Sequence, residues 1–206
     1  MNCSLEPERQ LRARGFSLIA GIDEAGRGPL AGPVVAAAVV LPEDFAHPVL
    51  TDSKKLTARQ RERLYDELTA RAGVAWQVAV VAHGEIDRLN ILRATHAAMQ
   101  RAAAQLAQRP DHVLIDGRPV RDFPIAQTAL VGGDALSFSI AAASVIAKVT
   151  RDRLMIDFDA QFPHYGFAQH KGYGTALHLE RLRTHGPCPI HRRSFLPVRQ
   201  AELRFA

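Results

Sequence analysis

The stretch GIDEAGRGPLAGPVV, which runs from Gly21 to Val35, decides the fold of this chain. An apolar run leads into two adjacent acids, Asp23 and Glu24, and a turn dense in Gly and Pro follows them. Acidic residues are depleted in strands, so a pair at the end of one needs a reason. Because successive side chains of a strand point to opposite faces, both acids line one site only if the backbone turns there. The glycines predict such a turn, and two solvated acids at the mouth of a hairpin are the alternative.

The segments around this stretch alternate between strand and helix patterns. Apolar and valine-rich runs predict strands over 16–23, 34–41, 74–82, 112–116 and 125–131. Helices are predicted from a cap at Thr57 to Gly73, and over 88–108, 139–162 and 175–183. This order predicts an α/β fold in which helices flank a mixed sheet, with antiparallel strands first and parallel strands later.

The composition is that of a soluble globular protein. The 206 residues fit one domain, and their 47% hydrophobic content is ample for a core. No apolar run is long enough to span a bilayer, and the N-terminus lacks the apolar core of a signal peptide. The two cysteines, Cys3 and Cys188, show neither metal-ligand spacing nor a disulfide framework. We therefore expect a reduced, cytoplasmic protein with no membrane partner.

The formal charge of +5 is unevenly distributed. From Arg181 to Ala206 there are six arginines and one glutamate, a surplus of five, so the rest of the chain is balanced. A basic tail on a neutral body indicates a polyanion partner, although a solvated basic face would have the same composition.

Well-known phosphate-binding and nucleophile motifs are missing from the sequence. GRGPLAG is not G-x-G-x-x-G, and neither a P-loop nor a G-x-S-x-G elbow occurs. The Cys and His spacings resemble no structural zinc site. Carboxylates therefore remain as the candidates for chemistry.

Two further acids follow apolar strands. LIDG places Asp116 at the end of one predicted strand, and GGD places Asp134 just after the last one. Carboxylates at three strand ends suit a hard divalent cation, Mg²⁺ or Mn²⁺, which also relieves their mutual repulsion. Two such ions would activate a water and stabilise the leaving oxygen in phosphodiester hydrolysis. An Asp-Gly turn and a helix N-cap are the alternative roles of these two acids.

Six segments of the chain, taken together, resemble a known family. They are GIDEAGRGPLAGPV, DSKKLT, LIDG, AAASVIAKVTRD, YGFAQHKGYGT and HRRSF. In this order, from Gly21 to Phe195, they are similar to bacterial ribonuclease HII. The resemblance implies a ribonuclease H-like fold: a mixed five-stranded sheet, flanking helices and a helical C-terminal extension. It also implies an endonuclease that uses Mn²⁺ or Mg²⁺ to activate water. Such an enzyme cuts the RNA strand of RNA–DNA hybrids and nicks 5′ of ribonucleotides embedded in duplex DNA, leaving 3′-hydroxyl and 5′-phosphate ends.

The resemblance assigns roles to the acids by position. It implies a catalytic, metal-binding set made of Asp23, Glu24, Asp116 and Asp134. Asp152, in the TRD segment, competes with Asp134 on spacing, and we assign it instead to ion pairing with Arg neighbours on a helix surface. The chain departs from the common family pattern at Gly132, which stands in place of a frequent lysine.

The resemblance also implies contacts with the substrate. Gly26, Arg27 and Gly28 are similar to the family's ribonucleotide-sensing loop, whose backbone approaches the 2′-hydroxyl closely. Tyr173 is expected against the sugar beside the cleavage junction. Phosphate contacts are expected of Lys54, Lys55, Lys148 and Lys171, with Arg192 and Arg193 as further candidates. For each of these residues alone, a solvated surface position is the alternative.

We expect residues 1–206 to form a single domain and a monomer, with a helical, basic, substrate-binding extension over about 164–206. Binding to a sliding clamp is a further possibility, but the end, RQAELRFA, matches clamp motifs poorly, so a frayed terminus is expected. Two other functions compete with a ribonuclease. A DNA-cutting nuclease or resolvase would need the acids but no 2′-hydroxyl sensor, and an inactive hybrid-binding module would not need the acids.

Overall fold

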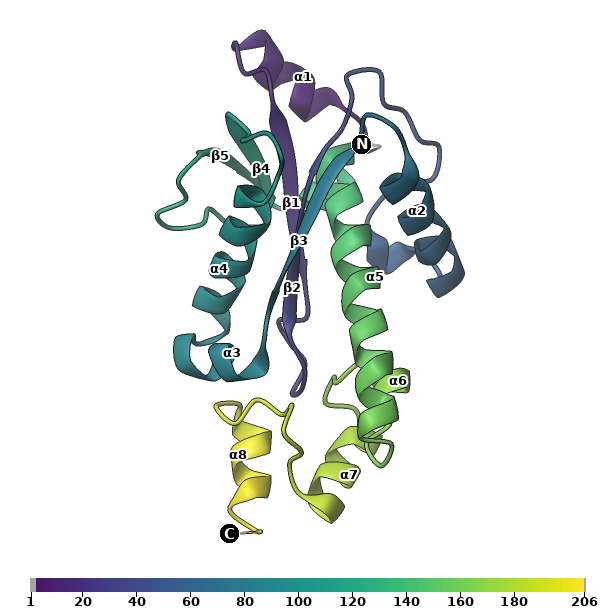
Figure 1. The fold of residues 1–206 in the computed structure, drawn as a ribbon, viewed down its shortest axis with the longest axis vertical. Coiled ribbons are helices and arrows are strands. Elements are labelled where there is room, and N and C mark those ends of the chain that lie inside the picture. The colour runs from purple at the N-terminus through teal and green to yellow at the C-terminus, as the bar shows by residue number, and fades with distance from the viewer. Residues whose placement is uncertain (1–2, 206) are drawn as a thin grey trace.

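A mixed five-stranded sheet forms the centre of the computed structural model, which describes residues 3–205 (Figure 1). The strands are β1 (Ile19–Ala25), β2 (Val34–Val40), β3 (Ala75–Val81), β4 (His112–Asp116) and β5 (Ala126–Leu130). Their order across the sheet is β3-β2-β1-β4-β5. The β1–β2 and β2–β3 pairs are antiparallel, and the β1–β4 and β4–β5 pairs are parallel. The predicted sheet, with antiparallel strands first and parallel ones later, is confirmed.

Helices cover both faces of the sheet. They are α1 (Glu6–Ala13), α2 (Ala58–Ala70), α3 (His83–Leu89), α4 (Ile91–Ala104), α5 (Phe138–Gln161), α6 (Phe167–His170), α7 (Ala176–His185) and α8 (Leu196–Glu202). In Figure 1 the sheet is seen nearly on edge, with α3 and α4 on one side and α2 and α5 on the other. Strand β2 contributes to both hydrophobic cores: Val34 and Ala36 to the core under α4, Val35 and Ala37 to the core under α5. Burial on both faces explains why β2 reads as a continuous apolar run.

Helix α5 lies directly against β1, and Gly21 makes this approach possible. A Cβ atom at Gly21 would lie only 2.1 Å from the Ser139 carbonyl carbon and 2.3 Å from the Ile140 nitrogen. The helix backbone therefore occupies the space that any other side chain would need. This close packing brings the start of α5, and the turn before it, next to the acid end of β1.

Two helical predictions hold in outline and differ in detail. Thr57 does cap α2, in a reciprocal capping box with Gln60. The single helix predicted over 88–108 is instead two, α3 and α4, because Asn90 between them has a φ of 68° and its side chain caps the Arg93 nitrogen. An Asn in the left-handed region ends one helix and starts the next.

The C-terminal elements pack against the loop that joins β1 to β2. Leu30 lies in one buried cluster with Leu182 of α7 and with Val198 and Ala201 of α8. The backbone of this loop also pairs with the segment before α8, through an isolated bridge between Ala31 and His191. The predicted frayed terminus is wrong as far as Glu202, because burial of one apolar face holds α8 in place; Ala206 lies outside the described residues. None of the helices within residues 3–205 has both the length and the apolar character needed to cross a membrane.

Candidate metal and substrate site

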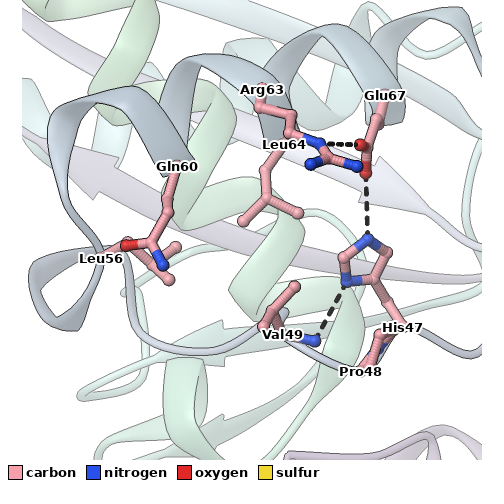
Figure 2. Close-up of a pocket in the computed structure, with 8 residues that line it drawn as sticks. All are labelled: His47, Pro48, Val49, Leu56, Gln60, Arg63, Leu64 and Glu67. Atoms are coloured by element: carbon pink, nitrogen blue, oxygen red, sulfur yellow. Dashed lines mark hydrogen bonds and ion pairs between the residues drawn. The ribbon is translucent and has the colours of Figure 1, made fainter.

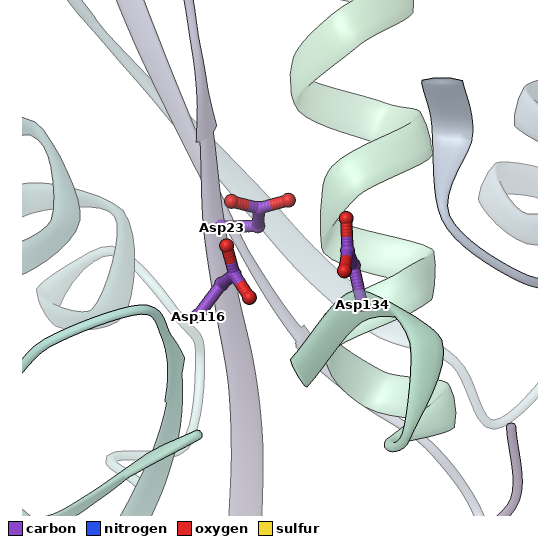
Figure 3. A group of neighbouring side chains, drawn as sticks. All are labelled: Asp23, Asp116 and Asp134. Carbon is purple, nitrogen blue, oxygen red and sulfur yellow. The ribbon is translucent and has the colours of Figure 1, made fainter. Parts of the chain in front are cut away.

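Three acids converge at neighbouring ends of the sheet. Asp23 lies near the end of β1, Asp116 ends β4, and Asp134 lies in a 3₁₀ turn (Gly133–Ala135) just after β5. One carboxylate oxygen from each lies within 4.8 Å of the others, and Figure 3 shows the three groups pointing toward one another. The parallel pairing of β1 with β4 places their carboxyl ends at the same edge. The Asp116 carboxylate also accepts the Gly133 N–H at 2.7 Å, which fixes the turn that carries Asp134.

The electrostatics of this cluster favour a cation. Asp23 and Asp134 are only 4% and 5% exposed. Burial, then the charges of Glu24 and Asp116, raises the pKa of Asp23 well above its usual range. Burial, then the charge of Asp116, likewise raises the pKa of Asp134. Like charges held this closely without a counter-ion favour protonation, and an all-oxygen set suits Mg²⁺ or Mn²⁺. The residues present therefore fit a hard divalent cation.

Glu24 lies beside this cluster and not within it. Strand β1 continues through Ala25, so the turn begins later than the sequence indicates, and the side chains of Asp23 and Glu24 leave opposite faces of the strand. Both still line one cavity of about 260 Å³. Glu24 pairs with Arg27 at 3.2 Å, between Oε1 and Nη1.

Asp134, and not Asp152, lies with Asp23 and Asp116. Asp152 pairs with Lys148 one turn earlier on α5, with Oδ1 and Nζ 2.7 Å apart. The predicted ion pairing of Asp152 on a helix is thus observed, but its partner is a lysine and not an arginine. Lys54 lies close to the cluster, with its Nζ 3.6 Å from the Asp134 carboxylate.

The glycine loop forms a wall of the same cavity. Gly26, Arg27 and Gly28 all line it, and so does Tyr173. Gly26 has a φ of 99°, and a Cβ atom there would lie 2.1 Å from Nε of Arg151. A Cβ at Gly28 would lie 3.5 Å from Cε1 of Tyr173, so the tyrosine ring faces the loop across a narrow gap. Only glycine fits the conformation and the space at Gly26.

Two buried arginines hold the loop between β1 and β2, which includes the glycine loop, by its carbonyl oxygens. Arg192 was predicted to contact phosphate, and this is wrong. Its side chain is fully buried and donates to the carbonyls of Gly26 (2.6 Å), Arg27 (3.0 Å), Gly32 (2.9 Å) and Pro33 (3.1 Å). Arg151, which sequence reasoning missed, donates to the carbonyls of Pro33, Lys171 and Ala31. No sequence signal marked it, because Arg151 stands in the charged second half of α5, between Thr150 and Asp152. Burial lowers the pKa of Arg151 to about 10 and that of Arg192 to about 9.

The predicted basic residues divide into two groups. Lys54 and Lys148 line the acid-bearing cavity, and Lys148 and Lys171 line a neighbouring groove of about 440 Å³ that also includes Tyr173. Lys55 is exposed and lines neither. Arg193 is exposed and pairs with Glu202, so it too lies away from the acids.

A separate cavity of about 290 Å³ lies between α2 and the loop before it (Figure 2). Its polar groups already satisfy one another. Val49 donates its N–H to Nδ1 of His47, so Nε2 carries the proton and donates to Glu67 at 3.1 Å. Glu67 also pairs with Arg63 at 2.7 Å. This cavity shares no residue with the acid-bearing one and offers no converging acids, so we assign it no chemistry.

Comparison with known proteins agrees with this site. A family profile described as ribonuclease HII matches residues 20–198. The ribonuclease HII of Syntrophotalea carbinolica is 53% identical over 193 residues, 94% of this chain and 92% of that protein. The crystal structure of ribonuclease H2 from Pyrococcus horikoshii OT3 superimposes with a TM-score of 0.77 at 29% identity, covering 92% of this chain and 99% of that one.

A more distant structure adds to the likeness in fold. It is Bst-RNase HIII in complex with Mn²⁺, with a TM-score of 0.69 at 19% identity, covering 92% of this chain and 70% of that one. The family match spans both the cluster of buried acids and the glycine loop. The chain therefore belongs to the ribonuclease HII family and is a divalent-metal-dependent nuclease with ribonuclease H activity on RNA–DNA hybrids.

Proposed function

We propose that this enzyme nicks duplex DNA on the 5′ side of an embedded ribonucleotide, as well as cutting the RNA strand of hybrids, and leaves 3′-hydroxyl and 5′-phosphate ends. One observation carries the proposal: Asp23, Glu24 and Asp116 line a single cavity together with the glycine loop and Tyr173. A site that recognises one sugar and cuts the phosphate beside it needs its sugar-binding groups and its metal-binding acids about one nucleotide apart.

The acids would hold the metal. Asp23, Asp116 and Asp134 offer converging oxygens, and Glu24, on the same cavity, is proposed as the fourth member of the set. Mn²⁺ or Mg²⁺, when bound, supplies Lewis-acid activation of water and stabilises the departing 3′-oxygen. The protein's own contribution is to keep these oxygens fixed. The backbone N–H of Gly133 donates a hydrogen bond to the Asp116 carboxylate, and the backbone N–H of Glu24 donates one to the Asp23 carboxylate, each 2.7 Å long.

The glycine loop would recognise the ribose. The 2′-hydroxyl is the group that separates RNA from DNA, and it both donates and accepts hydrogen bonds. Backbone at Gly26 and Gly28 reaches the cavity without a side chain in between, and the buried Arg192 holds two of the loop's carbonyls in place. We assign the 2′-hydroxyl to this backbone.

The remaining contacts would position the duplex. Tyr173 is 45% exposed and its ring faces Gly28, which supports a role for the ring in packing on the sugar that follows the ribonucleotide. Added 2′-hydroxyls would crowd that ring, so deoxyribose is preferred there. We propose that Lys54, Lys148 and Lys171 contact phosphates, with Lys55 further out. In this proposal the chain is a single domain whose part from about residue 164 binds the duplex. A monomeric state, a cytoplasmic location and clamp binding stay predictions.

A three-substrate assay tests the proposal. The duplexes are all DNA, DNA with one ribonucleotide, and a long RNA–DNA hybrid, each end-labelled and mapped in Mg²⁺ and in Mn²⁺. We expect cuts 5′ of the single ribonucleotide, ends that a polymerase extends, and an intact all-DNA duplex. Equal cutting of all-DNA duplex would support the resolvase alternative.

Variants complete the assay. Asp23→Asn and Asp116→Asn should lower cleavage by orders of magnitude, because each removes a charge from the metal's ligands. Asp66→Asn makes the same change on the exposed surface of α2 and is the matched control. Near wild-type cleavage by either site variant at physiological Mg²⁺ would refute the metal site. Tyr173→Ala should lower cleavage at a single ribonucleotide more than within a long hybrid.

A further inference from the structure

Three buried histidines gather behind Tyr173, and none has a role in the site described above. His178 and His191 are fully buried, and His170 is 8% exposed. They come from α7, from the segment before α8 and from α6, respectively. The rings of His170 and His178 are stacked, 4.4 Å apart between centroids and 13° from parallel.

His178 and His191 form a directed chain of hydrogen bonds. At one end the Cys188 backbone N–H lies 3.0 Å from Nδ1 of His191. At the other end Nδ1 of His178 lies 2.9 Å from the carbonyl oxygen of Tyr173. Between them the two Nε2 atoms are 3.0 Å apart. The chain thus links Cys188 to Tyr173 through both rings.

The two ends determine the position of every proton. A backbone amide only donates, so Nδ1 of His191 accepts and its proton is on Nε2. A carbonyl only accepts, so Nδ1 of His178 carries the proton and its Nε2 accepts. The middle bond therefore runs from Nε2–H of His191 to Nε2 of His178. With both rings neutral, all four ring nitrogens are used.

An added proton would break this chain. A second proton on either ring would set two N–H groups against each other, at the middle bond or at the Cys188 amide. Burial lowers the pKa of His178 to about 4 and that of His191 to about 3, so both rings are neutral near pH 7. The Cys188 thiol, 3.1 Å from Nδ1 of His191, is also uncharged, since burial raises its pKa to about 11.

The same C-terminal segment also holds the glycine loop. Arg192 follows His191 directly and binds the carbonyls of Gly26 and Arg27. Its backbone N–H donates to the Leu30 carbonyl at 2.9 Å, and the Gly32 N–H donates to the Ile190 carbonyl at 2.9 Å. Residues 190–192 therefore hold both parts of the site by hydrogen bonds. Arg192 binds the glycine loop, and His191 is linked through His178 to Tyr173.

We propose that His178 and His191 are positioning residues that set the place of Tyr173 relative to the Gly26–Gly28 loop, and thereby the preference for an RNA-to-DNA step. The inference rests on the proposed function, in which loop and ring contact successive sugars. The Tyr173 carbonyl accepts one other hydrogen bond, from the Thr175 N–H at 2.8 Å. Without the histidine chain, only that local turn holds the carbonyl.

Two substitutions at His191 separate positioning from simple packing. His191→Gln keeps an amide N–H at the ε position, able to donate to His178, whereas His191→Leu fills the space without a donor. His185→Leu, at the exposed end of α7, is the control. Each protein is assayed on the single-ribonucleotide duplex and on a long hybrid, with kcat and KM determined separately.

We expect His191→Leu to lower kcat on the single-ribonucleotide duplex by on the order of tenfold, the effect of one lost buried hydrogen bond. The loss on the long hybrid should be smaller, and Gln should restore most of the rate. An equal loss on both substrates, or a Gln variant as poor as Leu, would overturn the inference. Wild-type protein that does not cut the single-ribonucleotide duplex at all would instead refute the proposed function.

A spectroscopic readout tests the histidine chain itself, even if the Leu variant does not fold. Nitrogen-15 NMR of the histidine rings in the wild-type chain at pH 7 should show His178 protonated at Nδ1 and His191 at Nε2. In His191→Gln, His178 should keep its Nδ1 proton. The opposite tautomers, or a doubly protonated ring, would overturn the inference whatever the activity.

Discussion

Asp23→Asn should stabilise the metal-free enzyme, even though it should abolish most of its activity. The substitution removes one charge from three carboxylates whose oxygens lie within 4.8 Å of one another. Two unit charges at that distance repel by about 3.5 kcal/mol at an effective dielectric constant of about 20. The fold already relieves part of this repulsion, since the pKa of Asp23 is raised. The Asn side-chain oxygen keeps the hydrogen bond from the Glu24 amide.

We therefore expect the free energy of unfolding to rise by about 2 kcal/mol without metal, or roughly 4–8 °C in Tm for a chain of this size. The assay is thermal unfolding followed by circular dichroism, in EDTA and in excess Mg²⁺ or Mn²⁺. A cation at about 100 times its Kd would stabilise the wild-type chain by about 2.7 kcal/mol and should reverse the order. Asp66→Asn, which makes the same change on the exposed surface of α2, should stay within about 0.5 kcal/mol of wild type in both conditions.

Two results would refute this reasoning. A variant less stable than wild type in EDTA would mean that the Asp23 carboxylate is held by attraction and not against repulsion. An equal metal-induced rise in Tm for wild type and Asp23→Asn would mean that Asp23 is not a ligand of the cation.

Three further predictions concern packing, substrate binding and pH. Gly21→Ala should lower the free energy of unfolding by more than about 3 kcal/mol or prevent folding, since its Cβ would lie 2.1 Å from the α5 backbone. Gly84→Ala, with open space around it, should leave the free energy of unfolding unchanged or raise it by up to about 1 kcal/mol. Urea unfolding measures both variants. Alanine in place of Lys54, Lys148 or Lys171 should lower the slope of log K for hybrid binding against log salt concentration by about one, with the cleavage position unchanged. Unchanged slopes would assign these lysines to the solvated surface. The folded-state pKa values of His178 and His191 lie below the ordinary 6.5, so unfolding takes up protons. The contribution of the two rings to the free energy of unfolding is therefore complete above about pH 6.5. It is lost as pH falls toward 4, by up to about 1.4 kcal/mol per pH unit for each ring. Unfolding midpoints measured between pH 7 and pH 4 would contradict this if they did not move.

The elements that the sequence predicted well are those whose cause is local. Alternation and apolar runs depend on neighbouring residues, so all five strands were found within a few residues of their true ends. The cap at Thr57 involves a residue only three positions away. The acids at Asp23, Asp116 and Asp134 were found because each ends or follows a strand, and parallel strands bring their ends to one edge.

Other features depend on contacts between residues far apart in the chain, and only the tertiary structure decided them. In the sequence Arg192 looked like a surface cation in a basic tail that would contact phosphate. In the structure it is buried and donates to four carbonyls about 160 positions earlier, so it supports the loop instead. His178 and His191 carry no periodic signal, and their tautomers follow from partners that only folding supplies. The sequence by itself determined which groups are candidates for the chemistry, because that depends on residue type. The tertiary structure decided which groups hold them in place, because a buried polar side chain takes its role from whichever partners surround it.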